Sequence, residues 1–158
     1  MRKILTGSLL LTGLLLGSAS HAQTWASPVS LAGSTTTVAF DTCSLPSEQL
    51  YVEYSAFSFF APVAVYRIIS LQVGRLPMLH PYALTLQPYG WDASLWVCRQ
   101  RQGNQLNDCE DGSDNWGVGT NEFATVPATV GTHYIVVTAN SDNIWPLCGQ
   151  ILLTAHRY

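Results

Sequence analysis

The residues best suited to do chemistry lie between Cys98 and Gly117, in the stretch CRQRQGNQLNDCEDGSDNWG. This stretch is rich in carboxylates and amides, and Leu106 is its one bulky aliphatic residue. Ca²⁺ binds oxygen ligands of this kind and takes about six to eight of them. The sequence therefore makes calcium a candidate cofactor, with the ligands Asp108, Glu110, Asp111 and Asp114 and with Glu122 in reserve.

The acidic stretch also has a simpler interpretation as a solvated turn. An EF-hand register fails, because placing Gly112 at the sixth loop position puts Cys109 at the third and Val118 at the twelfth. Any calcium site here would therefore be of an irregular loop type. If Cys98 and Cys109 form a disulfide, the residues between them become a tethered hairpin tip, and such tips are polar because water surrounds them.

Aromatic residues are the second functional signal. Five tryptophans are many for a chain of this size, and several aromatic residues lie in or beside expected turns. An exposed ring next to polar side chains can hold a sugar ring or a peptide, because the ring supplies apolar contact and the polar groups orient the ligand. The alternative is that the rings cap the ends of the fold. The candidate binding residues are Tyr89, Trp91, Trp116 and Trp145, whereas Trp96 is expected in the core or on a sheet face.

Catalytic motifs are missing from the sequence, so no catalytic residue is assigned. Neither G-x-S-x-G nor H-E-x-x-H occurs, and paired cysteines would leave no thiol nucleophile. His133 is expected to be a hydrogen-bonded core residue, and His80 and His156 are expected to be exposed. A small hydrolase that uses loop carboxylates remains the alternative from another functional class.

Alternation of apolar and polar residues predicts an all-β fold. In YALTLQPY, Tyr82, Leu84 and Leu86 share one face, which is the period-2 pattern of a half-buried strand. Glycines and prolines punctuate the joins, and no helical periodicity occurs. About eight strands predict an antiparallel β-sandwich of jelly-roll type. The other expected strands are 35–40, 50–60, 63–73, 93–99, 122–126, 133–138 and 150–156.

The first 22 residues have the three-part pattern of a secretory signal peptide. Arg2 and Lys3 precede an apolar run that is too short to span a bilayer, and small residues end at Ala22. Without this segment, five basic residues remain against ten acidic ones, a net charge near −5. Such a balance argues against phosphate backbones and anionic lipid as partners, and no nucleic-acid binding is expected. We expect a secreted or periplasmic chain, without membrane insertion, whose residues 23–158 form one domain.

The four cysteines are expected to form two disulfides, because their number is even and the signal-peptide pattern predicts that the chain is exported. Three pairings are possible. We favour Cys98 with Cys109, which closes a short loop, and Cys43 with Cys148, which ties the two ends of the domain.

The second half of the chain resembles the bacterial pre-peptidase C-terminal domain. The resemblance rests on the order of short pieces: VYRIISL (65–71), YGWDASLWVC (89–98), NDCEDGSDN (107–115), NEFATV (121–126), VGTHYIVVTA (130–139) and CGQILLTA (148–155). It implies a β-sandwich without catalytic residues, of a kind usually appended to exported enzymes. Some related domains bind collagen or calcium. Here no protease precedes the domain, and GRLPMLHPY (74–82) is longer than the turn expected at that place.

These observations together predict a secreted, non-catalytic binding module. Its partner would be an extracellular polysaccharide or protein, held by loop aromatics, with calcium as a candidate for ordering the acidic segment. The further alternatives are an inhibitor of another exported enzyme and a structural envelope protein.

Overall fold

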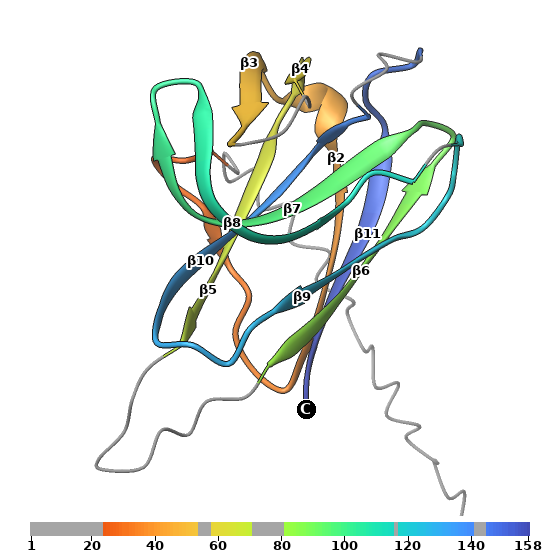
Figure 1. Ribbon diagram of the computed structural model, residues 1–158. Helices are drawn as coiled ribbons and strands as arrows, with labels where there is room; N and C mark the ends of the chain where they lie inside the picture. Colours follow the sequence, from red (N-terminus) through yellow and green to blue (C-terminus); the bar gives the residue numbers. More distant parts are fainter. Residues whose placement is uncertain (1–23, 54–57, 71–80, 116, 141–144) are drawn as a thin grey trace, which may run out of the picture.

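A computed structural model of the protein describes residues 24–53, 58–70, 81–115, 117–140 and 145–158. The expected signal peptide, His80 and most of the 74–82 connection lie outside these ranges. The described residues form eleven strands in two sheets and one short 3₁₀ helix, η1 (Thr42–Ser44) (Figure 1). None of their helices is long and apolar enough to cross a bilayer.

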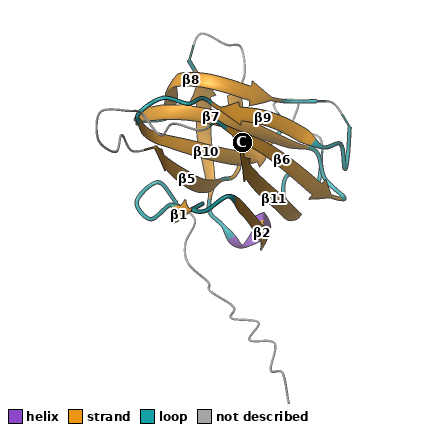
Figure 2. Ribbon diagram, turned by 90° about the horizontal axis from the view of Figure 1, so that it is seen from below, coloured by secondary structure: helices purple, strands orange, loops and turns teal. Residues whose placement is uncertain are grey.

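The larger sheet has seven strands in the order β1-β5-β10-β7-β8-β3-β4. The smaller sheet has four strands in the order β2-β11-β6-β9, and the two sheets lie as layers (Figure 2). Neighbouring strands are antiparallel except in the pairs β1–β5 and β3–β8. In chain order the strands are β1 (Val29–Ser30), β2 (Thr35–Asp41), β3 (Ser47–Val52), β4 (Ser58–Pro62), β5 (Ala64–Ser70), β6 (Tyr82–Tyr89), β7 (Ala93–Gln102), β8 (Gln105–Ser113), β9 (Glu122–Val126), β10 (Gly131–Ala139) and β11 (Gln150–Arg157).

The main core lies between the two sheets and follows from the alternation in the sequence. Leu84 and Leu86 of β6 and Leu153 of β11 point inward, and they meet Leu95 of β7 and Ile135 of β10 from the opposite layer. All five are at most 1% exposed. Burying one such side chain contributes about 1.5–3 kcal/mol, so these strands are held mainly by this layer of contacts.

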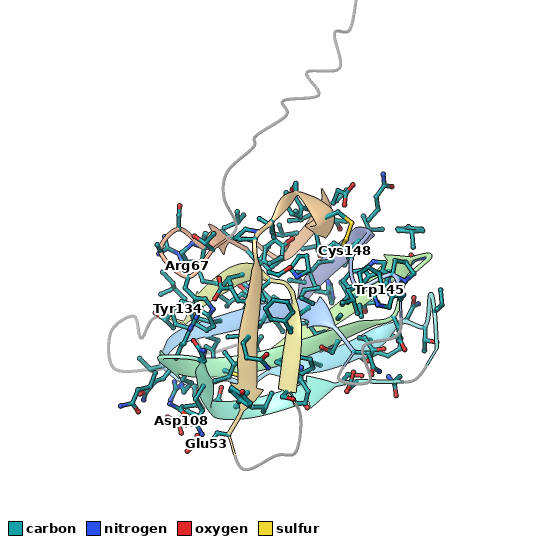
Figure 3. All side chains as sticks on the ribbon, turned by 90° about the horizontal axis from the view of Figure 1, so that it is seen from above. Glu53, Arg67, Asp108, Tyr134, Trp145 and Cys148 are labelled. Atoms are coloured by element: carbon teal, nitrogen blue, oxygen red, sulfur yellow. A yellow bond between two sulfur atoms is a disulfide. The ribbon has the colours of Figure 1, made fainter. Side chains whose placement is uncertain are left out.

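A second core covers the outer face of the larger sheet. The β3–β4 hairpin crosses over that face (Figure 3) and brings Leu50 and Phe59 against Trp96, Val65 and Val136. The rings of Phe59 and Trp96 lie 5.9 Å apart. The first part of β7 is therefore buried on both faces, which explains why its sequence is the nearly continuous apolar run ASLWVC.

The predicted all-β sandwich is confirmed, and two details of the strand prediction are wrong. The expected strand 50–60 is divided between β3 and β4, two antiparallel strands that pair with each other. Residues 107–113, expected in a turn, belong to strand β8, which pairs with β7. The short β1 was also not predicted.

Both favoured disulfides are present. Cys43–Cys148 spans 105 residues of chain, and Cys98–Cys109 joins facing residues of β7 and β8. No described cysteine is free. Two disulfides indicate that the protein folds in an oxidising environment.

Candidate functional site

The four candidate aromatic residues occupy different environments. Tyr89 ends β6 and is 50% exposed, while Trp145 is 79% exposed. Trp116 lies outside the described residues. Trp91 was predicted to be a binding residue, and this is wrong, because its side chain is completely buried in the main core. The turn that contains Trp91 is at the surface, but its indole points inward beneath the start of β11.

Trp91 supports the site from below. Its Nε1 donates a hydrogen bond to the carbonyl oxygen of Gln150 at 3.1 Å. A Cβ on Gly149 would lie 2.6 Å from Trp91 Cδ1, so glycine lets the backbone pass directly over the ring. Contact with Trp91 therefore fixes how far the start of β11 lies from the core, and with it the position of Gln150.

A shallow groove of about 470 Å³ lies on the outer face of the smaller sheet. Asp41 of β2, Gln150 of β11 and Tyr89 of β6 are cross-strand neighbours at one end of it. Ala39 and Leu152 form the adjoining apolar floor. The groove thus places an aromatic ring, an amide and a carboxylate in one row across three strands.

The end of the sheet that carries this groove is braced covalently and by hydrogen bonds. The Cys43–Cys148 disulfide connects η1, which follows β2, to the segment that precedes β11. The Thr42 hydroxyl donates to the Gly149 carbonyl at 3.0 Å and accepts from the Gly149 amide at 3.1 Å. The Asp41 carboxylate accepts from the Cys43 amide at 3.0 Å through one oxygen. These bonds hold the backbone at this end of the groove and the carboxylate of Asp41 in fixed positions, which lowers the entropy lost on binding.

Trp145 stands at the same end of the sandwich. It precedes Cys148 by three residues, and its indole projects from the rim near that disulfide (Figure 3). An exposed indole at the rim and an exposed phenol in the groove give two apolar faces for a ring-shaped ligand. The predicted involvement of Tyr89 and Trp145 is therefore compatible with the geometry, and it stays a prediction.

The predicted calcium ligands do not come together. Asp108 accepts a hydrogen bond from the Gln100 side chain at 3.3 Å, whereas Glu110 bonds to His133 at 2.7 Å. Asp111 reaches in another direction and accepts from the Thr125 amide of β9 at 2.6 Å. Because residues 108–113 form a strand, their side chains alternate between faces instead of lining one loop.

Within the described residues, no group of three or more His, Cys, Asp or Glu side chains is arranged to hold a metal ion. Asp114 lies beyond the end of β8, and its negative charge acts on Glu122. The geometry therefore offers no support for the calcium hypothesis from the four residues that the sequence suggested.

Glu122, the reserve ligand, is a fully buried carboxylate that the sequence did not predict to be buried. Its Oε2 accepts from the Ser113 hydroxyl and, at 3.0 Å each, from the backbone and side-chain amides of Asn115. Desolvation raises the pKa of Glu122, these hydrogen bonds lower it, and the charge of Asp114 raises it further, with a net upward shift. Oε1 has no hydrogen-bond partner among the described residues. Glu122 thus anchors the end of β8 and the residues that follow it.

The environment of His133 is as predicted for a core histidine. It is completely buried, with Nδ1 2.7 Å from Glu110 Oε2 and Nε2 3.5 Å from the Thr129 hydroxyl. The order hydroxyl, imidazole, carboxylate is that of a catalytic triad. However, Nε2 lies closer to the Thr129 carbonyl, at 3.3 Å, and Thr129 does not line the groove at Tyr89. These contacts fit a structural network. His156 is exposed, as predicted.

A second groove, also about 470 Å³, lies beside the β7–β8 hairpin. The rings of Trp25 and Tyr134 lie 4.9 Å apart in it, and the Arg101 guanidinium stands 5.5 Å from the Trp25 ring centroid. Both arginines of this groove already have carboxylate neighbours, Arg101 with Glu48 at 2.6 Å and Arg99 with Glu110 at 3.6 Å. Because those carboxylates offset the positive charge, this groove is a weaker candidate than the one at Tyr89.

Comparisons of the chain with protein-family models, with curated proteins and with solved structures found no match.

Proposed function

We propose that the protein is an exported, non-catalytic binding module that recognises an extracellular polymer through the groove at Tyr89. The observation that carries this proposal is the arrangement of that groove: a half-exposed phenol ring stands beside the amide of Gln150, which in turn lies beside the carboxylate of Asp41. The ring would pack against the face of a sugar, and the carboxylate and amide would accept and donate hydrogen bonds to its hydroxyl groups.

Export is part of the same proposal. The signal-peptide pattern of residues 1–22 and the two disulfides both fit a chain that leaves the cytoplasm. The resemblance to pre-peptidase C-terminal domains points the same way, because those domains accompany exported enzymes. Asp41 adds one negative charge to a chain that is already acidic, so a neutral polymer suits the groove better than a polyanion.

The proposal is tested by depletion of the oxidised protein, residues 23–158, from solution. The protein is mixed with insoluble collagen, chitin, cellulose and peptidoglycan, and the protein that stays in solution is measured. Selective depletion by one polymer is the expected result. Tyr89→Ala should weaken it roughly tenfold, which corresponds to about 1.4 kcal/mol of lost contact.

Tyr51→Ala is the matched control, because Tyr51 is 49% exposed and belongs to the β3–β4 hairpin, away from the groove. Both variants remove the same side chain from the surface. Equal depletion of the Tyr89 variant and the wild type would rule out the groove as the site. No depletion by any polymer would reject polymer binding and leave a protein partner as the alternative.

A further inference from the structure

The outer face of the smaller sheet is larger than the groove and has an unusual composition. Strand pairing places its outward side chains in four rows, and no other described segment packs over them. The rows are Asp41–Gln150–Tyr89, Ala39–Leu152–Gln87, Thr37–Thr154–Thr85–Phe123 and Thr35–His156–Ala83–Thr125. We call this set the threonine face.

Charge is nearly absent from the threonine face. Asp41 is its only carboxylate, and none of its residues is lysine or arginine. The acidic residues of the larger sheet, in contrast, lie on β3 and β8, as Glu48, Asp108, Glu110 and Asp111 show. Exposed sheet faces of soluble proteins usually carry interspersed charges, which keep them from associating with other surfaces. The threonine face therefore suits a neutral partner.

Half of the side chains of this face are short, because seven of its fourteen residues are threonine or alanine, and two pairs of side chains restrain each other. The hydroxyls of Thr37 and Thr154 lie 3.2 Å apart, and the Thr35 hydroxyl lies 2.8 Å from His156 Nδ1. Rows on one face of a strand repeat about every 7 Å, and neighbouring strands lie about 4.8 Å apart, so the four strands present a regular area of roughly 15 by 20 Å. Its hydroxyl and methyl groups can meet a flat, hydroxyl-rich surface with little loss of side-chain entropy.

The composition also argues against a protein as the partner. The centres of protein interfaces are enriched in aromatic residues, methionine and arginine. In the centre of the threonine face Leu152 is the one large aliphatic residue, and the aromatic residues Tyr89 and Phe123 lie at its ends.

We infer that the threonine face is a docking surface for the flat side of a neutral, insoluble polysaccharide, and that the Tyr89 groove is one end of this surface. This inference rests on the proposed function and extends it by naming the ligand class. A single soluble sugar chain needs only the groove, whereas a packed array of chains contacts all four rows.

The test separates the face from the groove by substituting Thr154, which lies in the third row, away from Tyr89. Microcrystalline cellulose and chitin serve as insoluble probes, with cellohexaose and chitohexaose as their soluble counterparts. Thr154→Lys and Thr154→Glu should each reduce partition onto the matching solid at least tenfold. Both should leave the dissociation constant of the soluble hexasaccharide within about twofold of the wild-type value. Tyr89→Ala should weaken both kinds of binding.

Thr154 is replaced by a positive and by a negative residue because a purely electrostatic effect of the solid would weaken the binding of one variant and strengthen that of the other. Gln105→Lys adds the same charge on the β7–β8 hairpin and should change neither measurement. Thermal unfolding of each variant shows whether it is folded. The inference is overturned if either Thr154 variant stays within twofold of wild type on the solid, or if wild type binds neither solid. Wild type that binds a solid but neither hexasaccharide would instead reject the groove.

Discussion

Glu122 shows how one residue can make stability depend on pH. It is fully buried, and burial raises the pKa of its carboxyl group above the ordinary value of 4.5. The folded protein therefore holds the proton at pH values where the unfolded chain has released it. Between the two pKa values the folded state binds more protons, so the free energy of unfolding falls as pH rises through this window.

Glu122→Gln should remove this pH dependence. Glutamine keeps an oxygen that can accept from Ser113 and Asn115, and it has no charge to desolvate. Near pH 4 the variant and the wild type should have similar stability. Above the raised pKa the variant should be equally or more stable, because the desolvation penalty is gone. Urea unfolding at several pH values measures the difference, and a wild-type stability that increases with pH relative to the variant would contradict this account.

Trp91 and Glu122 also mark the limit of sequence reasoning for single residues. Trp91 follows Gly90 in a turn and was expected at the surface, whereas Glu122 was predicted only as a reserve calcium ligand. Their burial depends on which loop covers the end of the sandwich, and strand periodicity does not specify that. The exposure of Tyr89, expected from its place beside a turn, and the burial of His133, expected from its place in an apolar strand, were predicted correctly.

Strand β8 was missed because its sequence lacks the usual strand composition. Leu106 is its only aliphatic residue, and glycine and aspartate, which are depleted in strands, occur within it. Pairing with β7 and the Cys98–Cys109 disulfide supply the stability that intrinsic preference does not. Gly112, which reads as a turn residue, faces Trp96 across the ladder, and a Cβ there would lie 2.3 Å from Trp96 Cε3.

Gly112→Ala should therefore destabilise the protein by about 1–3 kcal/mol, the range for overpacking in a well-packed region. The indole of Trp96 is only 8% exposed and packs against Phe59, so it cannot easily move aside. Chemical denaturation measures the effect, and a double-mutant cycle with Trp96→Leu identifies its cause. In the Trp96→Leu background, Gly112→Ala should be nearly neutral. An undiminished penalty there would show that the ring is not what excludes the methyl group.

At the scale of the whole molecule, the sequence predicted the fold class and the covalent framework. Period-2 alternation in strands such as β6, β9 and β11 indicated two layers around one core, and an even number of cysteines indicated two disulfides. The sequence did not predict that β3 and β4, at one edge of the larger sheet, fold over its other strands while the outer face of the smaller sheet stays open. Which face of a sheet is covered depends on pairing between strands far apart in the sequence, such as β11 between β2 and β6. The alternation of residues within one strand does not specify such pairing.

The Cys43–Cys148 disulfide connects this global fold to the proposed site. It closes 105 residues, so on the chain-entropy model it stabilises the folded state by on the order of 5 kcal/mol, against about 3 kcal/mol for the 11-residue Cys98–Cys109 loop. Replacing each pair by alanine should thus lower the free energy of unfolding more for Cys43/Cys148 than for Cys98/Cys109, as urea denaturation can measure.

The same two variants should differ in ligand binding, because only one disulfide borders the groove. Without Cys43–Cys148, this end of the sheet keeps the pairing of β2 with β11 and the Thr42–Gly149 hydrogen bonds, but it loses its covalent connection. Asp41 and Gln150 then lose part of their restraint, and binding of the hexasaccharide should weaken severalfold under conditions where both variants are folded. The Cys98/Cys109 variant should bind as wild type does. If both variants bind equally well, the disulfide stabilises the sandwich without organising its binding face.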